Sequence, residues 1–504
     1  MESAFDVIVV GAGNAAFCAA HAARETGARV LMLEKAPRTL AGGNTYFTAG
    51  AIRTTYDSLD DLRPLLADLS DEDAALIDLP PYTPEDFAAD MRRLTQGRCD
   101  PELTAILVGD VADTIRWLHD KGVRFRLMFE RQAFRIKGRY RFWGGLDLGT
   151  VNGGPGLIER HTEAASAAGI RIRYETAATS LLQDSYGRVT GVICMGPDGR
   201  EEIRGAAVVL ACGGFEADPR MRAAYLGPNW DLAKVRGTPY NTGAGLQMAL
   251  DAGAEAYGHW SGCHSIAWDA AAPAQGGDVE IGYRYSKQSY PIGIVVNRDG
   301  ERFLDEGADF RTYTYAKYGA EILKQPGAIA WQLFDATTEP LLRQEEYTAP
   351  GVSRTEADSI RELAEKIGVD PDALERTVEA FNAAVQPGEF DPSIKDGKRT
   401  VGITPPKSNW AVPLERPPFL AFAVTCGITM TFGGVRIDAG GRVLGRDGRP
   451  IPGLYAAGEL VGGLFYHNYP GGSGLASGAV FGRRAGRSAG TFARGQGGEA
   501  AAAA

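Results

Sequence analysis

Two hydrophobic patterns follow each other along the first 34 residues. Residues 6–10 are almost wholly apolar, which is typical of a strand buried in a parallel sheet. A glycine-rich turn follows at 11–16, and from there to about Glu25 the apolar residues have the spacing of an amphipathic helix. A second, mostly apolar run over 29–33 ends at Glu34. The pattern predicts a strand, a glycine turn, a helix and a second strand that ends on an acid.

The glycine turn has the residues that a dinucleotide-binding site needs. Gly11 allows a tight turn, Gly13 lets a pyrophosphate approach the backbone, and the small Ala16 lets the helix pack close to the sheet. Free N–H groups at the start of the helix attract phosphate. Glu34 follows at the offset of roughly 20 residues at which a carboxylate can accept hydrogen bonds from a ribose. Dinucleotide binding therefore explains the segment better than an ordinary glycine-rich turn does.

Further strands of the same domain are predicted in the middle of the chain and near its end. The apolar segments lie at 170–174, 177–182, 205–210 and 453–458. The third runs into a second glycine turn, and the last ends at Glu459, shortly before a glycine-dense stretch. A helix is expected to begin near Gly472, with its N-terminus aimed at the ligand.

The character of the sequence changes between residues 246 and 401. Aromatic and charged residues are more frequent there, and helices are predicted over 356–367 and 372–384. We therefore expect an α/β fold in which a discontinuous Rossmann-type nucleotide-binding domain carries an inserted α+β capping domain. The expected parts are 1–245 (nucleotide-binding, first part), 246–401 (cap), 402–487 (nucleotide-binding, last part) and 488–504 (disordered tail).

Charge and cysteine content narrow the classes of function. The net charge of -10 argues against nucleic acid as a partner. The six cysteines are scattered without a C-x-x-C pair, which disfavours a zinc or iron–sulfur site and fits the reduced thiols of a cytoplasm. No apolar run reaches the roughly 20 residues that span a bilayer, and the first strand begins too early to leave room for a signal peptide. We expect a cytoplasmic protein without a metal site.

Four segments carry a resemblance to a known family. They are AGGNT at 41–45, WSGCHS at 260–265, TCGIT at 425–429 and GLFYHNYPGGSG at 463–474. Together with the N-terminal unit, they resemble the flavoprotein subunits of the succinate dehydrogenase and fumarate reductase family, and within it the FAD-dependent tricarballylate dehydrogenases. The resemblance covers almost the whole chain. It implies an FAD domain with a cap that closes over the substrate, which agrees with the discontinuous layout.

The resemblance implies FAD rather than NAD as the cofactor. Larger family members attach FAD through a histidine just before a glycine-rich segment, and residues 38–48 contain no histidine, so we expect non-covalent FAD. The chain has no ligands for iron–sulfur clusters, so its electron acceptor must be separate; one candidate is a membrane-associated electron-transfer protein that would hold the enzyme at the inner membrane. The residues implied as FAD contacts are Gly11, Gly13, Asn14, Glu34, Lys35, Gly43, Asn44, Thr45, Ala178, Gly213, Glu459, Ser473 and Leu475.

Removing hydrogen from a carboxylic acid requires a hydride acceptor, a base for the neighbouring proton, and fixed cations for the carboxylates. In the family an arginine of the cap moves the proton, and the matching position is Arg311; its alternative role is a salt bridge to a nearby acid. His264 matches a histidine that binds a substrate carboxylate, and its alternative is a buried structural histidine. His467 lies in the glycine-dense segment, near Tyr469, which stands where fumarate reductases have a substrate-clamping arginine.

These departures from fumarate reductases favour a polycarboxylate other than succinate. The expected reaction is tricarballylate to cis-aconitate by hydride transfer to flavin N5. A cap cluster of Arg284, Tyr285 and Lys287 could receive a third carboxylate, or it could be a solvated loop. The alternatives are a dehydrogenase or reductase of a ketosteroid, of another unsaturated acid or of a tetrapyrrole precursor, and a non-catalytic flavin redox module.

Overall fold

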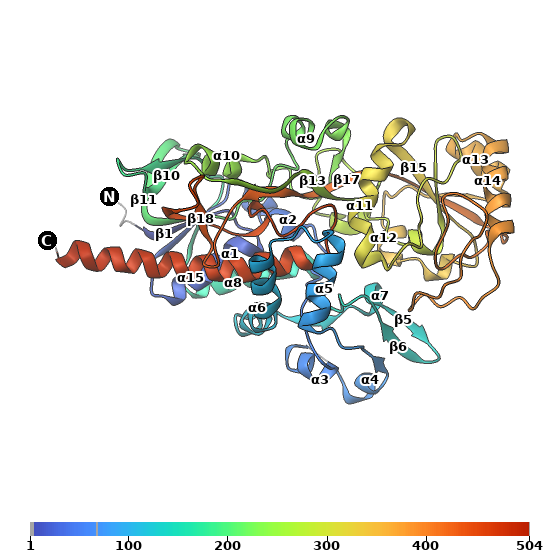
Figure 1. Ribbon diagram of the computed structural model, residues 1–504, viewed down its shortest axis with the longest axis horizontal. Helices are drawn as coiled ribbons and strands as arrows, with labels where there is room; N and C mark the ends of the chain where they lie inside the picture. The colour runs from blue at the N-terminus through green and yellow to red at the C-terminus, as the bar shows by residue number, and fades with distance from the viewer. Residues whose placement is uncertain (1–4, 67–68, 503–504) are drawn as a thin grey trace.

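The chain folds into a nucleotide lobe and a cap, with a smaller region of helices and short strands beneath the place where they meet (Figure 1). The computed structural model describes residues 5–66 and 69–502. Strands and helices alternate in the nucleotide lobe, whereas the cap is a mostly antiparallel sheet with helices packed on it. The expected fold class, an α/β nucleotide domain with an inserted α+β cap, is confirmed.

The nucleotide lobe is built on a sheet of eight described strands. Their order is β18-β19-β11-β1-β2-β8, with β10 beside β11 and β9 beside β10. The central β1 pairs in parallel with β2 and β11, so the carboxyl ends of these three strands open at one edge of the sheet. The strands are β1 (Phe5–Val10), β2 (Val30–Leu33), β8 (Arg171–Arg173), β9 (Ala177–Gln183), β10 (Val189–Gly196), β11 (Gly199–Leu210), β18 (Arg442–Leu444) and β19 (Pro450–Ala456).

The helices of this lobe pack around the sheet, and several of them begin close to the edge at which the strands open. The first of them, α1, begins directly after the glycine turn, and α15 begins at the residue after Gly472, as predicted. The helices are α1 (Asn14–Glu25), α2 (Gly43–Tyr46), α8 (Gly153–Ala167), α9 (Pro219–Leu226), α10 (Ala244–Asp251) and α15 (Ser473–Ala502).

A row of glycines lets α15 lie directly on α1. Gly482, Gly486 and Gly490 are four residues apart and therefore share one face of the helix. A Cβ atom on Gly482 would lie 2.5 Å from the carbonyl oxygen of Ala15, and one on Gly486 would lie 2.0 Å from that of Ala19. Only glycine allows such an approach of two backbones. Figure 1 shows α15 running along the lower edge of the lobe to the C-terminus.

The expected disordered tail at 488–504 is wrong over the part that the structure describes. Helix α15 continues without a break to Ala502, and Ala489 and Ala493 are buried. The small residues that resembled a low-complexity tail are the contact surface of the helix. Residues 503–504 lie outside the described residues.

The cap is built on a sheet of six described strands, in the order β12-β17-β15-β14, with β13 and β16 also paired to β17. It has a hydrophobic core of its own, in which α13 and α14 pack on the sheet. The strands are β12 (Lys234–Val235), β13 (Ala256–Asp269), β14 (Ile294–Asn297), β15 (Ile329–Phe334), β16 (Thr355–Ala357) and β17 (Phe419–Val435). The helices are α11 (Arg311–Leu323), α12 (Gln344–Tyr347), α13 (Ile360–Ile367) and α14 (Pro371–Ala384).

This sheet extends beyond the expected cap boundaries of 246 and 401 at both ends. Strand β12 precedes the first boundary, and β17 follows the second. The change in composition at 246 and 401 did not locate the ends of the cap. Strands β12 and β17 belong to the cap through pairing with strands distant in sequence, which composition does not reveal.

Two long antiparallel strands, β13 and β17, connect the lobes through the middle of the molecule (Figure 1). They pair from Ala256 opposite Val435 to Asp269 opposite Val424. The register shifts twice, between His259 and Cys263 and between His264 and Ser265. At the first shift residues 260–262 of β13 are out of register, and at the second Thr429 of β17 is, so the pair of strands is irregular at both places.

The region beneath the two lobes is formed by the segment between residues 58 and 150. Helices α5 and α6 pack on each other, and α6 also contacts α15. The helices are α3 (Leu59–Leu62), α4 (Asp71–Ala75), α5 (Pro84–Leu94), α6 (Pro101–Asp120) and α7 (Phe129–Gln132). The strands are β3 (Ile77–Asp78), β4 (Phe125–Leu127), β5 (Ala133–Ile136), β6 (Arg139–Phe142) and β7 (Leu148–Thr150).

Candidate active site between the nucleotide lobe and the cap

One continuous cavity runs from the carboxyl ends of the central strands to the inner face of the cap. Its lining combines glycine turns of the nucleotide lobe with side chains of the cap. All but one of the predicted cofactor contacts line it, and the exception is Ser473, which is buried at the start of α15. The predicted contacts in the lining are Gly11, Gly13, Asn14, Glu34, Lys35, Gly43, Asn44, Thr45, Ala178, Gly213, Glu459 and Leu475.

The glycine turn after β1 has the shape that a pyrophosphate requires. Gly11 has φ 114°, and a Cβ atom there would lie 2.4 Å from the carbonyl oxygen of Ala211. Gly13 differs, because a Cβ atom there would meet no protein atom closer than 3.6 Å. Its bare Cα faces the cavity, next to the N-terminus of α1, which has no side-chain cap on Gly13. A phosphate can therefore approach the helix end closely.

The neighbouring side chains fix the turn and offer a carboxylate. The Asn14 backbone N–H donates to Thr45 Oγ1 at 3.1 Å, and its side-chain amide donates to the Leu475 carbonyl at 2.9 Å. Glu34, at the end of β2, is buried, and burial raises the pKa of its carboxyl. These residues fit an FAD, with the pyrophosphate at the start of α1 and a ribose at Glu34.

Glu216 is a second carboxyl, next to Glu459, that the sequence did not predict as part of the site. Glu459 accepts hydrogen bonds from the Thr431 N–H at 2.7 Å and its hydroxyl at 3.2 Å. Glu216 accepts from the amides of Asn44 and Asn241, both at 2.6 Å. Burial raises the pKa of both carboxyls, and for Glu459 the neighbouring Glu216 adds to the effect. The only sequence signal for Glu216 is its place directly after the glycine turn that follows β11.

At the cap end, Arg311 is the first residue of α11 and only 6% exposed. Its guanidinium donates to Gln288 Oε1 at 2.8 Å and to the Arg131 carbonyl at 3.1 Å. Among the described residues it has no carboxylate within ion-pair distance, so the alternative of a salt bridge to a neighbouring acid is wrong. Its nearest sequence acids have other cationic partners: Glu306 pairs with Arg302, and Asp309 pairs with Arg93.

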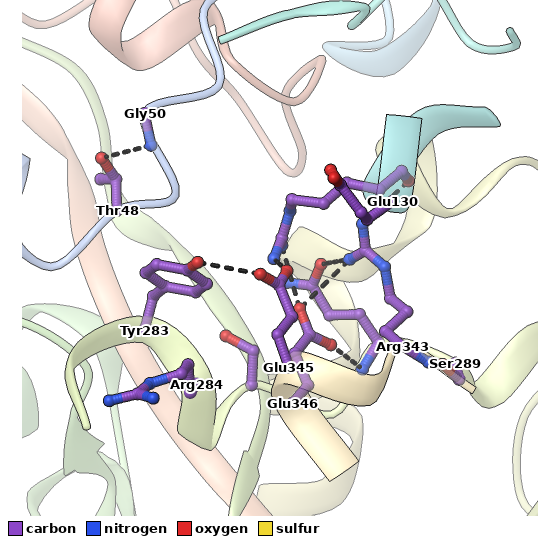
Figure 2. Close-up of polar contacts among 12 residues, drawn as sticks. Thr48, Gly50, Glu130, Tyr283, Arg284, Ser289, Arg343, Glu345 and Glu346 are labelled. Carbon is purple, nitrogen blue, oxygen red and sulfur yellow. Dashed lines mark hydrogen bonds and ion pairs between the residues drawn. The ribbon is translucent and has the colours of Figure 1, made fainter. Parts of the chain in front are cut away.

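Arg311 adjoins a cluster of charged side chains, of which Figure 2 labels Arg343, Glu345 and Glu346. Arg343 donates to the same two oxygen atoms, Gln288 Oε1 and the Arg131 carbonyl, at 3.1 and 2.8 Å. The fully buried Glu346 lies 2.9 Å from Arg131 and 3.2 Å from Arg343. Glu345 pairs with Arg131 and is 29% exposed. A path of contacts therefore joins Arg311 to solvent.

The electrostatics of this cluster distinguish Arg311 from an ordinary arginine. Burial lowers the pKa of its guanidinium well below the usual value, and the positive charges of Arg343 and Arg131 lower it further. Burial also lowers the pKa of Arg343, to about 10. At the outer end, burial would raise the pKa of Glu345, but Arg131 and Arg343 bring it down to about 2. Burial would lower the pKa of Arg131 as well, but Glu345 and Glu346 raise it above the usual value, so Arg311 and Arg343 hold their protons less tightly than Arg131 does.

His264 and Tyr469 lie together at the same end of the cavity. His264 is 1% exposed, and its ring contacts the rings of Tyr315 and Tyr469, with centroid distances of 5.0 and 4.8 Å. Neither ring nitrogen has a hydrogen-bond partner in the described part of the chain. The hydroxyls of Tyr315 and Tyr469 are 2.6 Å apart, and both residues line the cavity. Burial lowers the pKa of His264, with Arg236 adding to the effect, so its ring is neutral.

His467 does not join this group. Its side chain is exposed, its φ is 63°, and its backbone N–H donates to His259 Nδ1 at 3.1 Å. The left-handed backbone at this position turns the side chain outward, away from the cavity that Phe465 and Tyr469 line. The proposed substrate role of His467 therefore has no support in the geometry.

The expected third-carboxylate cluster is also dispersed. Lys287 is fully buried, 3.3 Å from Asp269, and donates to the Glu346 carbonyl at 2.7 Å. Arg284 donates to carbonyl oxygens of its own turn. Neither residue lines the cavity, and Tyr285 does not line it either. No helix within residues 5–66 and 69–502 is long and apolar enough to cross a membrane, and the same residues contain no group of three or more potential metal ligands.

Comparison with known proteins agrees with the geometry. The family described as FAD binding domain matches residues 6–475. A probable fumarate reductase, Ifc3, of Shewanella frigidimarina is 30% identical over 96% of this chain and 74% of its own length. The 4-oxocyclohexanecarboxylate 2-dehydrogenase of Sinomonas cyclohexanicum is 30% identical over 93% of this chain and 90% of its own. The open conformation of a flavocytochrome c3 fumarate reductase superposes with a TM-score of 0.73, at 28% identity, over 98% of this chain and 79% of that one.

The matched region includes the glycine turn, the cap and the first residues of α15, and it covers the cavity lining except Ser477 and Gly478. By their names, these relatives are a reductase of fumarate and a dehydrogenase of 4-oxocyclohexanecarboxylate. The chain thus belongs to the succinate dehydrogenase and fumarate reductase family of flavoproteins, and it is an FAD-dependent oxidoreductase acting on CH–CH bonds.

Proposed function

We propose that this enzyme desaturates a polycarboxylate, with tricarballylate, oxidised to cis-aconitate, as the favoured substrate. The observation that carries the proposal is Arg311, a buried guanidinium that lines the FAD cavity without a carboxylate partner among the described residues. Bound FAD would accept the hydride. The protein must then provide an acceptor for the proton of the adjacent carbon and a site for carboxylate groups.

Arg311 is the residue that removes this proton. Its lowered pKa makes the neutral guanidine accessible, and its place at the cavity wall puts it within reach of a substrate carbon. The proton is then lost to solvent from Arg311. Gln288 Oε1 accepts hydrogen bonds from both Arg311 and Arg343, and so connects Arg311 to Glu346, Arg131 and the partly exposed Glu345. The hydroxyls of Tyr315 and Tyr469, on which the neutral ring of His264 packs, supply hydrogen bonds to the substrate without adding charge.

The FAD is held without a covalent bond. No histidine lines the cavity within the described ranges, and residues 43–49, where a linking side chain would lie, contribute only glycine, asparagine, threonine and alanine to the lining. Denaturation in trichloroacetic acid should therefore release all of the flavin into the supernatant. Flavin that stays with the precipitated protein would contradict this proposal. Electrons leave the flavin for a separate acceptor.

A second candidate is desaturation beside a ring ketone that also carries a carboxylate. The paired hydroxyls of Tyr315 and Tyr469 could donate to a ketone oxygen, while Arg311 binds the carboxylate. The similarity to 4-oxocyclohexanecarboxylate 2-dehydrogenase supports this candidate. Burial, however, raises the pKa of Tyr469 well above its usual value, so its hydroxyl is a donor and not a base at neutral pH.

Anaerobic reduction of the bound flavin tests the proposal. The purified enzyme is mixed separately with tricarballylate, succinate, citrate, 4-oxocyclohexanecarboxylate and a 3-ketosteroid, and the oxidised flavin absorbance is followed. Bleaching by tricarballylate that disappears in Arg311→Ala supports the first candidate. Bleaching by the cyclic keto acid alone supports the second. Absence of bleaching by every acid, together with no reoxidation of reduced flavin by cis-aconitate or fumarate, would refute both.

A further inference from the structure

A second buried guanidinium faces the cavity at the cap end. Arg236 directly follows β12, and its backbone N–H donates to the Ile428 carbonyl of β17 at 2.8 Å. This pairing brings residue 236 beside residues 429–432, which also line the cavity. The side chain of Arg236 is only 8% exposed. The sequence contained no signal for it, because its place depends on a two-residue strand.

The contacts of Arg236 are all neutral. Its Nη1 donates to Thr429 Oγ1 at 3.1 Å, and its guanidinium carbon lies 5.8 Å from the ring centroid of Trp268. Its Nε is buried without a hydrogen-bond partner, and no carboxylate lies within ion-pair distance of it in the described part of the chain. Burial lowers the pKa of Arg236, and the hydroxyls of Tyr315 and Tyr469 act in the opposite direction.

A buried cation without a counter-ion is unfavourable, and proteins pair such charges. There are two explanations for the unpaired charge of Arg236. Either the fold tolerates its cost, or an anion that enters the cavity pairs with it. The second explanation agrees with its position. Its neighbours include His264, whose ring nitrogens are both unpartnered, and the hydroxyl pair of Tyr315 and Tyr469. Several donors therefore meet at one place where the protein supplies no anionic acceptor.

This place is distinct from the nucleotide end of the cavity and from Arg311. The glycine turn and Glu34 belong to strands β1 and β2, whereas Arg236 is held by the cap sheet. Arg311 is held by Gln288 and the Arg131 carbonyl, with which Arg236 has no hydrogen bond among the described residues. The two free guanidinium groups thus face one cavity from different walls.

We propose that Arg236, with Thr429 and the hydroxyl of Tyr469, forms a second carboxylate site that selects substrates with carboxylates on both sides of the reacting carbon–carbon bond. The inference rests on the proposed function, and it narrows the substrate class to acids with a butanedioate core. Tyr469, at the position where fumarate reductases have a clamping arginine, is uncharged, and Arg236 supplies the missing charge from another strand. An acid with one carboxylate would leave Arg236 unpaired.

The test is equilibrium binding of acids to the FAD-loaded enzyme, followed by perturbation of the flavin spectrum. Succinate and tricarballylate are compared with propionate and butyrate in the wild type, Arg236→Gln and Arg236→Lys. A charge-assisted hydrogen bond to a carboxylate contributes roughly 10- to 100-fold in affinity. The wild type should therefore bind the diacids at least about tenfold more tightly than the monoacids.

In Arg236→Gln this preference should disappear, with FAD content unchanged and monoacid affinity within about threefold of the wild type. Arg236→Lys keeps the charge but loses the forked donor, and it should retain part of the preference. Equal affinity of the wild type for mono- and diacids would overturn the inference, as would a preference that survives in Arg236→Gln or a variant that loses FAD. Flavin reduction is measured separately, so failure of the proposed reaction does not affect this result.

Discussion

The two ends of the cavity are built differently. At the nucleotide end, backbone groups of glycine turns face the ligand, and the strands that carry them are neighbours in one parallel sheet. At the cap end, the ligand surface consists of side chains, among them Arg236, Arg311 and Tyr469, which come from segments far apart in the sequence. The first surface depends on local backbone conformation, and the second depends on the packing of the whole cap.

The difference also concerns charge. Glu34, the acid at the nucleotide end, accepts backbone hydrogen bonds, so it is satisfied before any ligand binds. Arg236 and Arg311 at the cap end have no carboxylate partner among the described residues. Holding such groups in place opposes stability and prepares the site for an anion. Changes at the two ends should therefore have different consequences, and four experiments test this.

The largest effect is expected at Arg311. Arg311→Gln should lower the rate of flavin reduction by about 10³-fold, because a positioned general base contributes roughly 10²–10⁴. FAD should remain bound, since Arg311 does not belong to the nucleotide end. Stopped-flow absorbance with saturating substrate measures the rate.

Arg93→Gln is the matched control for Arg311→Gln. Arg93 pairs with Asp309 near the start of the same helix, but it is exposed and does not line the cavity. Its variant should react within about twofold of the wild type. If the rate of flavin reduction falls by less than tenfold in Arg311→Gln, Arg311 is not the general base.

The charged cluster behind Arg311 offers a comparison between two neighbouring acids. Glu346→Gln should reduce the free energy of unfolding by about 3–5 kcal/mol, because it leaves Arg131 and Arg343 with an unbalanced buried charge. Glu345→Gln should cost only about 1 kcal/mol, since that side chain is partly exposed. Urea unfolding of the FAD-loaded proteins measures both. Equal losses would mean that burial does not determine the strength of these pairs.

Two glycines of the same turn should respond differently to one methyl group. Gly11→Ala should destabilise the protein by about 1–3 kcal/mol even without FAD, because φ is 114° and the Ala211 carbonyl is in the way. Gly13→Ala should leave the unfolding temperature of the apoprotein unchanged and weaken FAD binding by about tenfold, since its Cβ atom would enter only ligand space. Calorimetry of the apoprotein and titration with FAD separate the two effects. If the apoprotein of Gly13→Ala is destabilised as much as that of Gly11→Ala, the turn is not shaped for a ligand.

The last prediction concerns pH, which should change the rate of flavin reduction gradually and not by a single large loss. Desaturation requires neutral Arg311, whose pKa is lowered by burial and by the charges of Arg343 and Arg131. At a pH below that pKa the neutral fraction, and with it the rate of flavin reduction by substrate, should rise about tenfold per pH unit. Reoxidation of reduced flavin by the unsaturated acid needs the protonated form and should be flat over the same range. A rate of flavin reduction that does not change between pH 6 and 9 would contradict the mechanism.

The nucleotide end could be predicted from the sequence in detail. The turn after β1, Glu34 at the end of β2 and the start of α15 near Gly472 are where the pattern placed them, because each depends on residues close in sequence. Among the predicted cofactor contacts, Ser473 alone does not line the cavity. It is the first residue of α15 and is fully buried. Arg311 was found only through resemblance, and composition would not have distinguished it from a surface arginine.

The remainder depends on contacts that a single sequence does not show. Arg236 reaches the cavity because β12 pairs with a strand almost 200 residues later. His467 leaves it because its backbone is left-handed, although its neighbours Phe465 and Tyr469 line the wall. In sequence the glycines near the end of α15 resemble a flexible tail. Their role depends on their spacing of four residues, which places them on the face of α15 that packs on α1. In each case the deciding partner is distant in sequence.

The irregular pairing of β13 with β17 affects how a substrate could enter the cavity. Any rotation of the cap away from the nucleotide lobe must flex β13 and β17, and the irregular pairing between residues 259 and 265 is the most compliant part of this two-stranded connection. His264 lies within that part, between the two register shifts. Opening the enzyme would therefore move His264 together with the rings of Tyr315 and Tyr469 that pack on it, so two hydroxyls of the cavity wall would shift in the same movement that admits solvent.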